Sequence, residues 1–229
     1  EMCIRDSISG IGCSGRLPVY LDFNTLHTTH GRALTFATGI KLAKPNLKVI
    51  AVMGDGDAAS IGGNHLIHSA RRNIDITAII INNQIYGMTG GQASPTTPFG
   101  LHTASTPFGH LEHPFDISCL VKAAGAPFVA RSTVYHSRLL ENIIGKAIAK
   151  SGFSVVEVMS PCVTHFGKWT GMGSAVDMMQ WQKDNTVQIE KARDMTPEQL
   201  EGKIVTGVLV DIEKPTFHEE HARISREMK

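Results

Sequence analysis

Cysteine is scarce in this sequence, and the few cysteines are dispersed. The 229 residues contain four cysteines, and none belongs to a Cys-x-x-Cys pair. So few thiols in a chain of this size argue against a disulfide framework, and a reducing cytoplasm is the expected location. The four are Cys3, Cys13, Cys119 and Cys162.

Net charge and long apolar runs are lacking as well. The formal charge is +1, which gives no indication that the chain binds nucleic acid. The longest apolar stretches, residues 49–53 and 76–81, are too short to span a bilayer. No signal-peptide pattern opens the chain, so no membrane association is expected. With 42% hydrophobic and 19% charged residues, the composition is that of a globular domain.

The beginning of the chain predicts that a native N-terminal region is missing. Residue 1 is Glu rather than Met, and residues 8–12 resemble the end of a buried strand. A domain rarely begins inside a strand. Residues 1–7 are therefore expected to be foreign to the domain.

Short apolar runs alternate with amphipathic stretches, which is typical of an α/β protein with a mostly parallel sheet. We expect an open sheet with helices on both faces. Strands are predicted at residues 8–11, 48–53, 75–82, 128–131, 153–159 and 204–212. Helices are predicted at residues 31–43, 59–72, 117–124, 137–150 and 178–195, and a charged peripheral tail follows from Thr216.

Residues 87–114 interrupt this alternation. The segment contains two adjacent glycines and four prolines and shows little periodicity. A loop of this length inside a compact domain is usually functional or disordered, and strong flanking elements favour an ordered functional loop. Thr89, Gln92 and Thr97 are candidates for hydrogen bonds to a ligand; the alternative is a polar surface loop.

Two polar motifs follow neighbouring predicted strands. Gly54-Asp55-Gly56-Asp57 follows the strand at 48–53, and Asn82-Asn83 ends the strand at 75–82. A right-handed crossover places the carboxyl ends of these strands side by side, where open α/β sheets bind ligands. The glycines allow close approach of a diphosphate, and a following helix N-terminus favours its charge.

The same motifs supply oxygen ligands suited to Mg²⁺. These are the Asp55 carboxylate and the Asn83 amide oxygen, with the Ile85 carbonyl as a third. The alternative for the tetrapeptide alone is a turn with a polar helix cap. An EF-hand calcium loop is excluded, because Leu66 occupies the position that requires a bidentate Glu.

Taken together, the motifs resemble the beta subunit of a 2-oxoacid:ferredoxin oxidoreductase. The matching segments are residues 11–16 (Ile-Gly-Cys-Ser-Gly-Arg), 30–32 (His-Gly-Arg), 54–57, 86–92 (Tyr-Gly-Met-Thr-Gly-Gly-Gln), 94–97 (Ser-Pro-Thr-Thr) and 160–162 (Ser-Pro-Cys). The resemblance covers residues 8–217. It implies a thiamine-diphosphate-binding fold and oxidative decarboxylation of a 2-oxoacid, 2-oxoglutarate being favoured over pyruvate, to an acyl-CoA.

The resemblance also assigns residues to the thiamine diphosphate. His30 and Arg32 are the catalytic candidates, since Arg can clamp a phosphate or carboxylate and His can orient the oxoacid. From the residues alone, a solvated helix cap remains the alternative. The cofactor-binding set is Ile11, Gly12, Cys13, Ser14, His30, Gly31, Arg32, Ala33, Gly54, Gly56, Asp57, Gly87 and Met88.

Cys13 and Cys162 are implied ligands of a 4Fe–4S cluster that passes electrons to ferredoxin. Such a cluster prefers four thiolates. The other two are implied near the native N-terminus, in a segment that this sequence does not contain. Without the resemblance, two buried structural cysteines are the alternative. Cys119, within a predicted helix, is expected in the core.

A partner chain is also implied. In thiamine enzymes a Glu from a separate domain activates the cofactor, and 229 residues leave no room for that domain. We therefore expect an alpha subunit carrying the pyrimidine-binding domain. Two alternatives remain open. One is a non-oxidative thiamine enzyme of the decarboxylase or acetolactate synthase type. The other is a non-catalytic nucleotide-binding subunit, which residues 10–15 do not support because no helix follows them.

Overall fold

The computed structural model describes residues 5–22 and 24–228. Cys3 lies outside these residues, as do residues 1–4 of the segment 1–7 that is expected to be foreign to the domain. The described strands are β1 (Arg5–Ser9), β2 (Asn24–His27), β3 (Lys48–Gly54), β4 (Thr77–Asn82), β5 (Ile85–Tyr86), β6 (Gln92–Ala93), β7 (Phe128–Thr133), β8 (Ser154–Met159), β9 (Thr186–Gln188) and β10 (Ile204–Asp211). The first strand thus begins earlier than predicted and includes residues 5–7, so the proposed boundary at residue 8 stays a prediction.

The helices described are α1 (Ala33–Ala43), α2 (Asp55–Ala59), α3 (Gly63–Arg72), α4 (Ile117–Ala123), α5 (Ser137–Ala149), α6 (Phe166–Thr170), α7 (Ala175–Asp184), α8 (Ile189–Ala192), α9 (Pro197–Leu200) and α10 (Phe217–Glu227), with 3-10 turns η1 (Ser14–Tyr20) and η2 (Val134–His136). In the part of the chain that the structure describes, no helix is long and apolar enough to cross a membrane.

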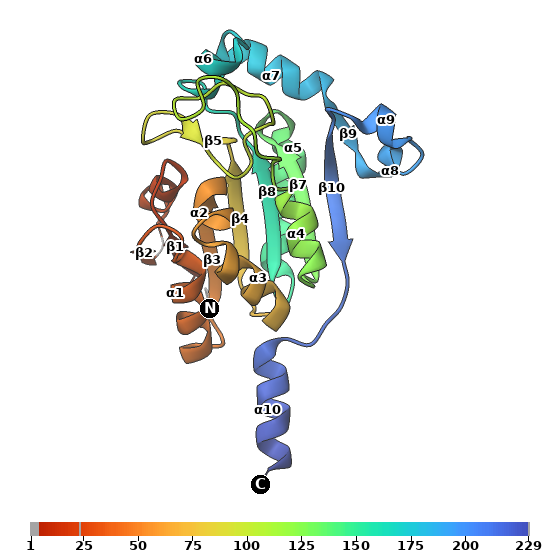
Figure 1. The fold of residues 1–229 in the computed structure, drawn as a ribbon. Helices are drawn as coiled ribbons and strands as arrows, with labels where there is room; N and C mark the ends of the chain where they lie inside the picture. The colour runs from red at the N-terminus through yellow and green to blue at the C-terminus, as the bar shows by residue number, and fades with distance from the viewer. Residues whose placement is uncertain (1–4, 23, 229) are drawn as a thin grey trace.

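Within the described residues, eight strands form one sheet in the order β2-β1-β3-β4-β8-β7-β10-β9 (Figure 1). The first six are mutually parallel, and β10 runs antiparallel to β7. This arrangement confirms the predicted α/β fold with a mostly parallel sheet. In β3 and β4, the predicted neighbours, Gly54 lies opposite Ile81.

Each face of the sheet buries its own hydrophobic core because strand side chains alternate between faces. Along β8, Val155 belongs to the core under α1, α3 and α4, whereas Val156 and Val158 belong to the core under α5. In α5, Ile143 and Ala147 stand four residues apart and pack on this second face. Helices therefore cover both faces, as predicted, and leave the strand ends free to build a site.

The predicted helix at residues 59–72 was wrong in its first part. The chain turns helical already at Asp55, leaves the helix at Ser60, and resumes in α3 at Gly63. Two glycines allow close contacts between chain segments at this break. A Cβ on Gly62 would lie 2.2 Å from the Asp57 carbonyl oxygen, and one on Gly31 would lie 2.9 Å from the Gly62 nitrogen. The residues before α1 thus press against this turn.

The predicted helix at residues 178–195 was also wrong. Helix α7 starts earlier, because Ser174 and Asp177 form a capping box, and it ends at Asn185. Residues 186–188 then pair with β10 as the edge strand β9. Pairing with a sheet edge here overrides the helical pattern, and local propensity does not contain that information. The 3-10 turn η1 and the edge strand β2 were not predicted.

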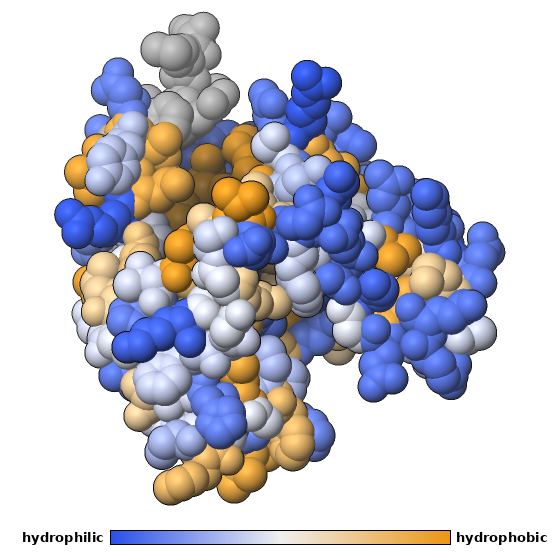
Figure 2. Space-filling model, turned by 90° about the horizontal axis from the view of Figure 1, so that it is seen from above, coloured by the Kyte–Doolittle hydropathy of each residue, from blue (hydrophilic) through white to orange (hydrophobic). Residues whose placement is uncertain are grey.

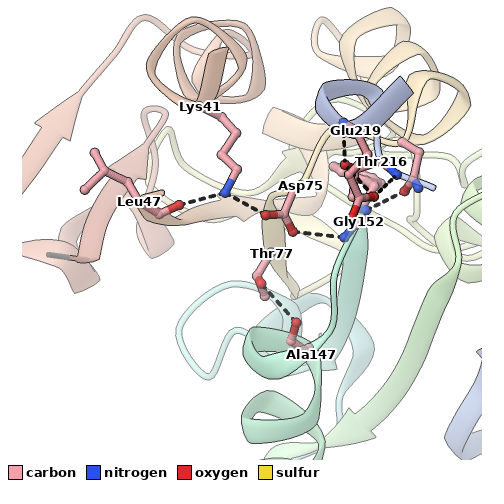
Figure 3. Close-up of polar contacts among 10 residues, drawn as sticks. Lys41, Leu47, Asp75, Thr77, Ala147, Gly152, Thr216 and Glu219 are labelled. Carbon is pink, nitrogen blue, oxygen red and sulfur yellow. Dashed lines mark hydrogen bonds and ion pairs between the residues drawn. The ribbon is translucent and has the colours of Figure 1, made fainter. Parts of the chain in front are cut away.

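Buried polar contacts fasten the amino-terminal end of the sheet (Figure 3). The Lys41 ammonium of α1 is 5% exposed; it lies 2.6 Å from the Asp75 carboxylate and donates to the Leu47 carbonyl at 2.8 Å. Asp75 also accepts from the Gly152 backbone N–H at 2.9 Å. These contacts tie α1, β4 and β8 together at the end of the sheet opposite the polar motifs.

The charged tail forms helix α10, drawn in blue in Figure 1, which projects away from the sheet. Thr216 and Glu219 cap its first turn, and Asn73 donates to the Lys214 and Pro215 carbonyls. None of its described residues is buried. The tail is therefore helical and, as predicted, peripheral.

Candidate functional site

The carboxyl ends of β1, β3 and β4 surround a cavity of about 340 Å³. Figure 2 shows this end of the molecule from above, where hydrophobic patches (orange) lie beside hydrophilic side chains (blue). Thirteen of the cavity residues were predicted from the sequence as cofactor or metal ligands, and Asp55, Asn83 and Ile85 are among them. Tyr86 and Thr89 complete the lining, and Thr89 was predicted only as a candidate for a hydrogen bond to a ligand. The full lining is Ile11, Gly12, Cys13, Ser14, His30, Gly54, Asp55, Gly56, Asp57, Asn83, Ile85, Tyr86, Gly87, Met88 and Thr89.

The three predicted metal ligands meet at one point beside the cavity. One terminal atom of the Asn83 amide lies 3.0 Å from Asp55 Oδ1 and 2.6 Å from the Ile85 carbonyl oxygen. If that atom is the nitrogen, it donates to both oxygens. If it is the amide oxygen, three acceptors face one another, and a cation between them would stabilise that arrangement.

Asp55 is a buried carboxylate, 2% exposed, at the start of α2. Burial raises its pKa above the ordinary value, because the charged form loses hydration. Two hydroxyl donors oppose this effect: Ser94 and Thr96 both donate to Oδ2 at 2.6 Å. The second carboxylate oxygen, Oδ1, is the one that faces Asn83.

The turn after β4 presents Asn83 and Ile85 to the cavity. Asn82 Oδ1 accepts from the Gln84 backbone N–H at 3.1 Å, and Gln84 has a φ of 60°. Residues other than glycine seldom adopt this left-handed conformation. Thr97 Oγ1 donates to the Gln84 carbonyl at 2.6 Å and so holds the turn from outside.

The loop hydroxyls are placed differently from the prediction. Thr97 is fully buried and faces the turn rather than the cavity, so its predicted ligand contact was wrong. Thr89 lines the cavity, and its hydroxyl donates to Gln92 at 2.6 Å. Ser94 and Thr96 belong to the matching segments of the sequence, but no role was predicted for either. The only signal was a group of hydroxyl side chains in an otherwise irregular loop.

Two glycines make room for neighbours that line the cavity. A Cβ on Gly56 would lie 2.2 Å from a Tyr86 ring carbon. A Cβ on Gly87 would lie 3.2 Å from Cys162 Sγ, 3.7 Å from Cys13 Sγ and 3.8 Å from Asn83 Nδ2. Gly87 therefore lies beside Asn83, a predicted metal ligand, and beside the two predicted cluster cysteines.

Cys13 and Cys162, far apart in the sequence, come together at Gly87. Both are free thiols; Cys13 is exposed and Cys162 is partly exposed. The His165 N–H donates to Cys162 Sγ at 3.4 Å. The alternative of a buried structural pair does not describe Cys13. Cys119 is also exposed, so its expected core position was wrong: Ile117, Ser118 and Val121 occupy the buried side of α4.

His30 lines the cavity, and its Nδ1 lies 2.9 Å from the Ile11 carbonyl oxygen. A carbonyl only accepts, so Nδ1 carries the hydrogen, and Nε2 of the neutral ring is an acceptor. Nδ1 also lies 3.4 Å from Asp57 Oδ1, which accepts from the Gly31 N–H. Burial raises the pKa of Asp57, while the Gly31 N–H and His30 oppose that effect. Asp57 thus positions His30 and Gly31.

Gly31, Arg32 and Ala33 do not line the cavity. The Arg32 guanidinium donates to His65 Nε2 at 3.0 Å and to the Ile61 carbonyl at 3.2 Å. Burial and the neighbouring Arg32 lower the pKa of His65. Ala33 is fully buried in the core. The predicted ligand contacts of these residues stay predictions.

In the described part of the chain, no three His, Cys, Asp or Glu side chains form a metal-binding group. Each of the two candidate sites described above contains fewer than three such side chains. The Asp55 site contains one carboxylate with two uncharged oxygen donors, and the second site contains two cysteines. A cation at the first site would be held by hard oxygen atoms, and a metal centre at the second needs ligands from elsewhere.

Known proteins resemble this chain over nearly its whole length. The family model described as thiamine pyrophosphate enzyme, C-terminal TPP binding domain, matches residues 10–158, which include the whole cavity lining. The chain is 54% identical to the 2-oxoglutarate synthase subunit KorB of Methanothermobacter marburgensis, over 91% of this chain and 73% of the relative. It is 50% identical to KorB of Methanocaldococcus jannaschii, over 97% and 83% respectively.

A solved structure gives the same result. The 2-oxoglutarate:ferredoxin oxidoreductase from Magnetococcus marinus, with 2-oxoglutarate, coenzyme A and succinyl-CoA bound, superposes with a TM-score of 0.88 and 33% identity. The alignment covers 100% of this chain and 78% of that one. This chain therefore belongs to the thiamine pyrophosphate enzymes and, among them, to the beta subunits of the 2-oxoacid:ferredoxin oxidoreductases.

Proposed function

We propose that this chain is the thiamine-diphosphate- and Mg²⁺-binding subunit of an enzyme that oxidatively decarboxylates a 2-oxoacid to an acyl-CoA. The proposed substrate is 2-oxoglutarate, and the proposed electron path runs through a 4Fe–4S cluster to ferredoxin. The relatives named 2-oxoglutarate synthase support the substrate, as does the solved relative that holds 2-oxoglutarate and coenzyme A.

The convergence of Asp55 Oδ1, the Asn83 amide and the Ile85 carbonyl carries this proposal. An all-oxygen set with one carboxylate suits Mg²⁺, which also takes diphosphate oxygens and water as ligands. The adjoining wall contains Gly54, Gly56 and Gly87, where the backbone is accessible to a diphosphate. The residues present therefore fit a magnesium diphosphate.

Thiamine diphosphate supplies, when bound, a carbon nucleophile and an electron sink for decarboxylation. The chain's own residues would bind and orient it. Gly54, Gly56, Gly87 and Met88 would contact the diphosphate. His30 also lines the cavity, with Nδ1–H held by the Ile11 carbonyl, so its Nε2 is free to accept a proton or a hydrogen bond from a reacting group.

Cys13 and Cys162 are the proposed cluster ligands in this chain. A Cβ on Gly87 would lie within 4 Å of both sulfur atoms, at the edge of the proposed cofactor site. Short separation between a cofactor and a cluster would favour electron transfer. Because iron–sulfur clusters prefer four thiolates, two further ligands must come from outside the described residues.

The proposed partner is an alpha subunit with a pyrimidine-binding domain. Among the described residues that line the cavity, the carboxylates are Asp55 and Asp57, and both are engaged with neighbours within the chain. Neither is available to activate the aminopyrimidine, a task that thiamine enzymes give to a Glu. That carboxylate would therefore come from the partner, and the isolated chain should be inactive.

The metal site is tested by Asp55→Ala, with Asp177→Ala as the control because the Asp177 side chain is exposed and caps helix α7. Calorimetric titration with thiamine diphosphate, with and without Mg²⁺, should show Mg²⁺-dependent binding in the wild type and control only. Unchanged binding to Asp55→Ala would refute the site.

The cluster and substrate are tested on the complex with its partner. Reduction of viologen should require CoA and be fastest with 2-oxoglutarate in a panel of 2-oxoacids. Cys13→Ser and Cys162→Ser should each lower the iron content, whereas Cys119→Ser, at an exposed site on α4, should not. Full iron content in the first two variants would exclude their ligand role.

A further inference from the structure

Residues 94–97 place three hydroxyl groups on the buried side of the proposed metal site. Ser94, Thr96 and Thr97 are 3%, 2% and 0% exposed, so all three are buried, and none of them lines the cavity. Ser94 and Thr96 donate to Asp55, a proposed metal ligand, and Thr97 donates to the carbonyl of Gln84, the residue between the other two ligands. We propose that these three hydroxyls are positioning residues that assemble the Mg²⁺ site, an inference that rests on the proposed function.

The first effect of the hydroxyls is on Asp55. Ser94 Oγ and Thr96 Oγ1 both donate to Oδ2 at 2.6 Å, which is the short distance expected for a charge-assisted bond. With two donors on Oδ2, rotation of the carboxylate is restricted. Oδ1 is therefore held toward Asn83 and Ile85, where a cation would bind.

The second effect is on the turn that carries Asn83 and Ile85. Thr96 Oγ1 lies 3.0 Å from Asn82 Oδ1, the atom that accepts from the Gln84 N–H. Thr97 Oγ1 donates to the Gln84 carbonyl at 2.6 Å. The left-handed Gln84 is thereby bonded at both ends of its backbone, and the ligands on either side of it are fixed in direction.

The hydroxyls are also contacted by backbone N–H groups of the same segment. The Ser94 N–H donates to Thr97 Oγ1 at 2.8 Å, and the Thr96 N–H lies 3.4 Å from Ser94 Oγ. Farther from the cavity, Asn82 Nδ2 donates to Glu157 at 2.8 Å, and Glu157 accepts from Arg131 at 2.8 Å. Through Asn82, the segment is therefore linked to buried polar side chains of β8 and β7.

The alternative is that these hydroxyls only satisfy one another in the core. The two roles predict different results for Thr96→Val and Ser94→Ala. Both changes remove a hydrogen bond with little change in volume, so a structural role alone would lower stability and leave metal affinity in the folded protein unchanged. A positioning role lowers metal affinity, by the 10- to 100-fold that is typical when a partner of a metal ligand is lost.

Mn²⁺ provides the probe, because free Mn²⁺ is measured directly by electron paramagnetic resonance. The complex with its partner is stripped of metal and titrated with Mn²⁺ at saturating thiamine diphosphate. Thr96→Val and Ser94→Ala should each weaken Mn²⁺ binding about 10- to 100-fold. Thr96→Ser retains the hydroxyl and should bind nearly as the wild type does.

The matched control is Thr106→Val in the same loop. Among the described residues, the hydrogen-bond partners of the Thr106 hydroxyl are Thr103, at 2.7 Å, and the Leu101 carbonyl, at 3.3 Å. Its loss should leave Mn²⁺ affinity unchanged. Thermal unfolding in the absence of ligands shows which variants fold; if Thr96→Val does not, Ser94→Ala and Thr96→Ser carry the test.

Asp55→Ala separates the two ways in which the expectation fails. If that variant binds Mn²⁺ as tightly as the wild type, the metal site itself is wrong, and the proposed function fails with it. If Asp55→Ala abolishes binding but folded Ser94→Ala and Thr96→Val retain wild-type affinity, the positioning role alone is refuted.

Discussion

The change Gly56→Ala adds one methyl group at the most crowded point of the cavity wall. Its Cβ would lie 2.2 Å, 2.6 Å and 2.8 Å from three atoms of the Tyr86 side chain, all closer than van der Waals contact. The Tyr86 backbone has little freedom to move, because Tyr86 pairs with Gln92 and its carbonyl accepts from Gly91 at 2.9 Å. The Tyr86 ring must therefore swing within the cavity.

Two contributions of opposite sign set the magnitude. Forcing an extra methyl into packed space costs about 1–3 kcal/mol. Alanine in a helix is favoured over glycine by about 0.5–1 kcal/mol, which offsets part of that loss. We expect a net loss of about 1 kcal/mol in the free energy of unfolding, together with weaker thiamine diphosphate binding because the displaced ring occupies cavity volume.

Gly145→Ala is the matched control. Gly145 lies within α5, and a Cβ there would meet nothing within 4 Å. The same substitution should therefore raise the free energy of unfolding by about 0.5–1 kcal/mol and leave cofactor binding unchanged. Urea unfolding followed by circular dichroism gives the stabilities, and calorimetry gives the affinities. A Gly56→Ala variant that gains stability as Gly145→Ala does, with unchanged affinity, would refute the crowding at Tyr86.

Two further predictions concern charges outside the cavity. Asp75→Ala removes the partner of the buried Lys41 ammonium and the acceptor of the Gly152 N–H, and should lower the free energy of unfolding, measured in urea, by about 3–5 kcal/mol. Adding Lys41→Met should restore part of that loss. A double variant no more stable than Asp75→Ala would contradict the ion pair. Burial alone would raise the pKa of Asp116, but the Arg131 guanidinium outweighs it and lowers that pKa below 3.8. Asp116→Asn removes this stabilisation, which is at most about 1 kcal/mol because the side chain is half-exposed. The stability difference between the wild type and the variant should therefore be present above pH 3.8 and disappear as the pH falls through the lower folded-state pKa. A stability difference that grows in acid would be inconsistent with the Asp116–Arg131 ion pair.

The approach of Asp55 to Asn83, two proposed metal ligands, was predictable because it depends on strand adjacency. Asp55 and Asn83 follow two strong strand patterns joined by a helix, and a right-handed crossover makes such strands neighbours. The observed pairing of β3 with β4 confirms that step. The approach of Cys13 to Cys162 was expected only from the family resemblance, since no local rule links the ends of β1 and β8.

The hydroxyl segment was not predictable in the same way. Ser94, Thr96 and Thr97 lie in a loop without periodicity, and nothing in their spacing indicates whether they face a ligand, the solvent or the interior. The structure places Thr97 against the Gln84 carbonyl and the other two against Asp55. Arg32 is a similar case: its sequence position suggested a phosphate clamp, and packing directs it to His65.

By itself, the sequence determined the class of fold, six of the eight strands described in the main sheet, the helices α1, α4 and α5, and the grouping of the proposed oxygen ligands at the carboxyl end of the sheet. These depend on hydrophobic periodicity and on chain connectivity, which are local properties. Only the tertiary structure decided where the helix after Asp55 breaks, that residues 186–188 form a strand, and which hydroxyls hold Asp55. Each of these outcomes depends on a contact between segments distant in sequence, whose free energy exceeds the local preference.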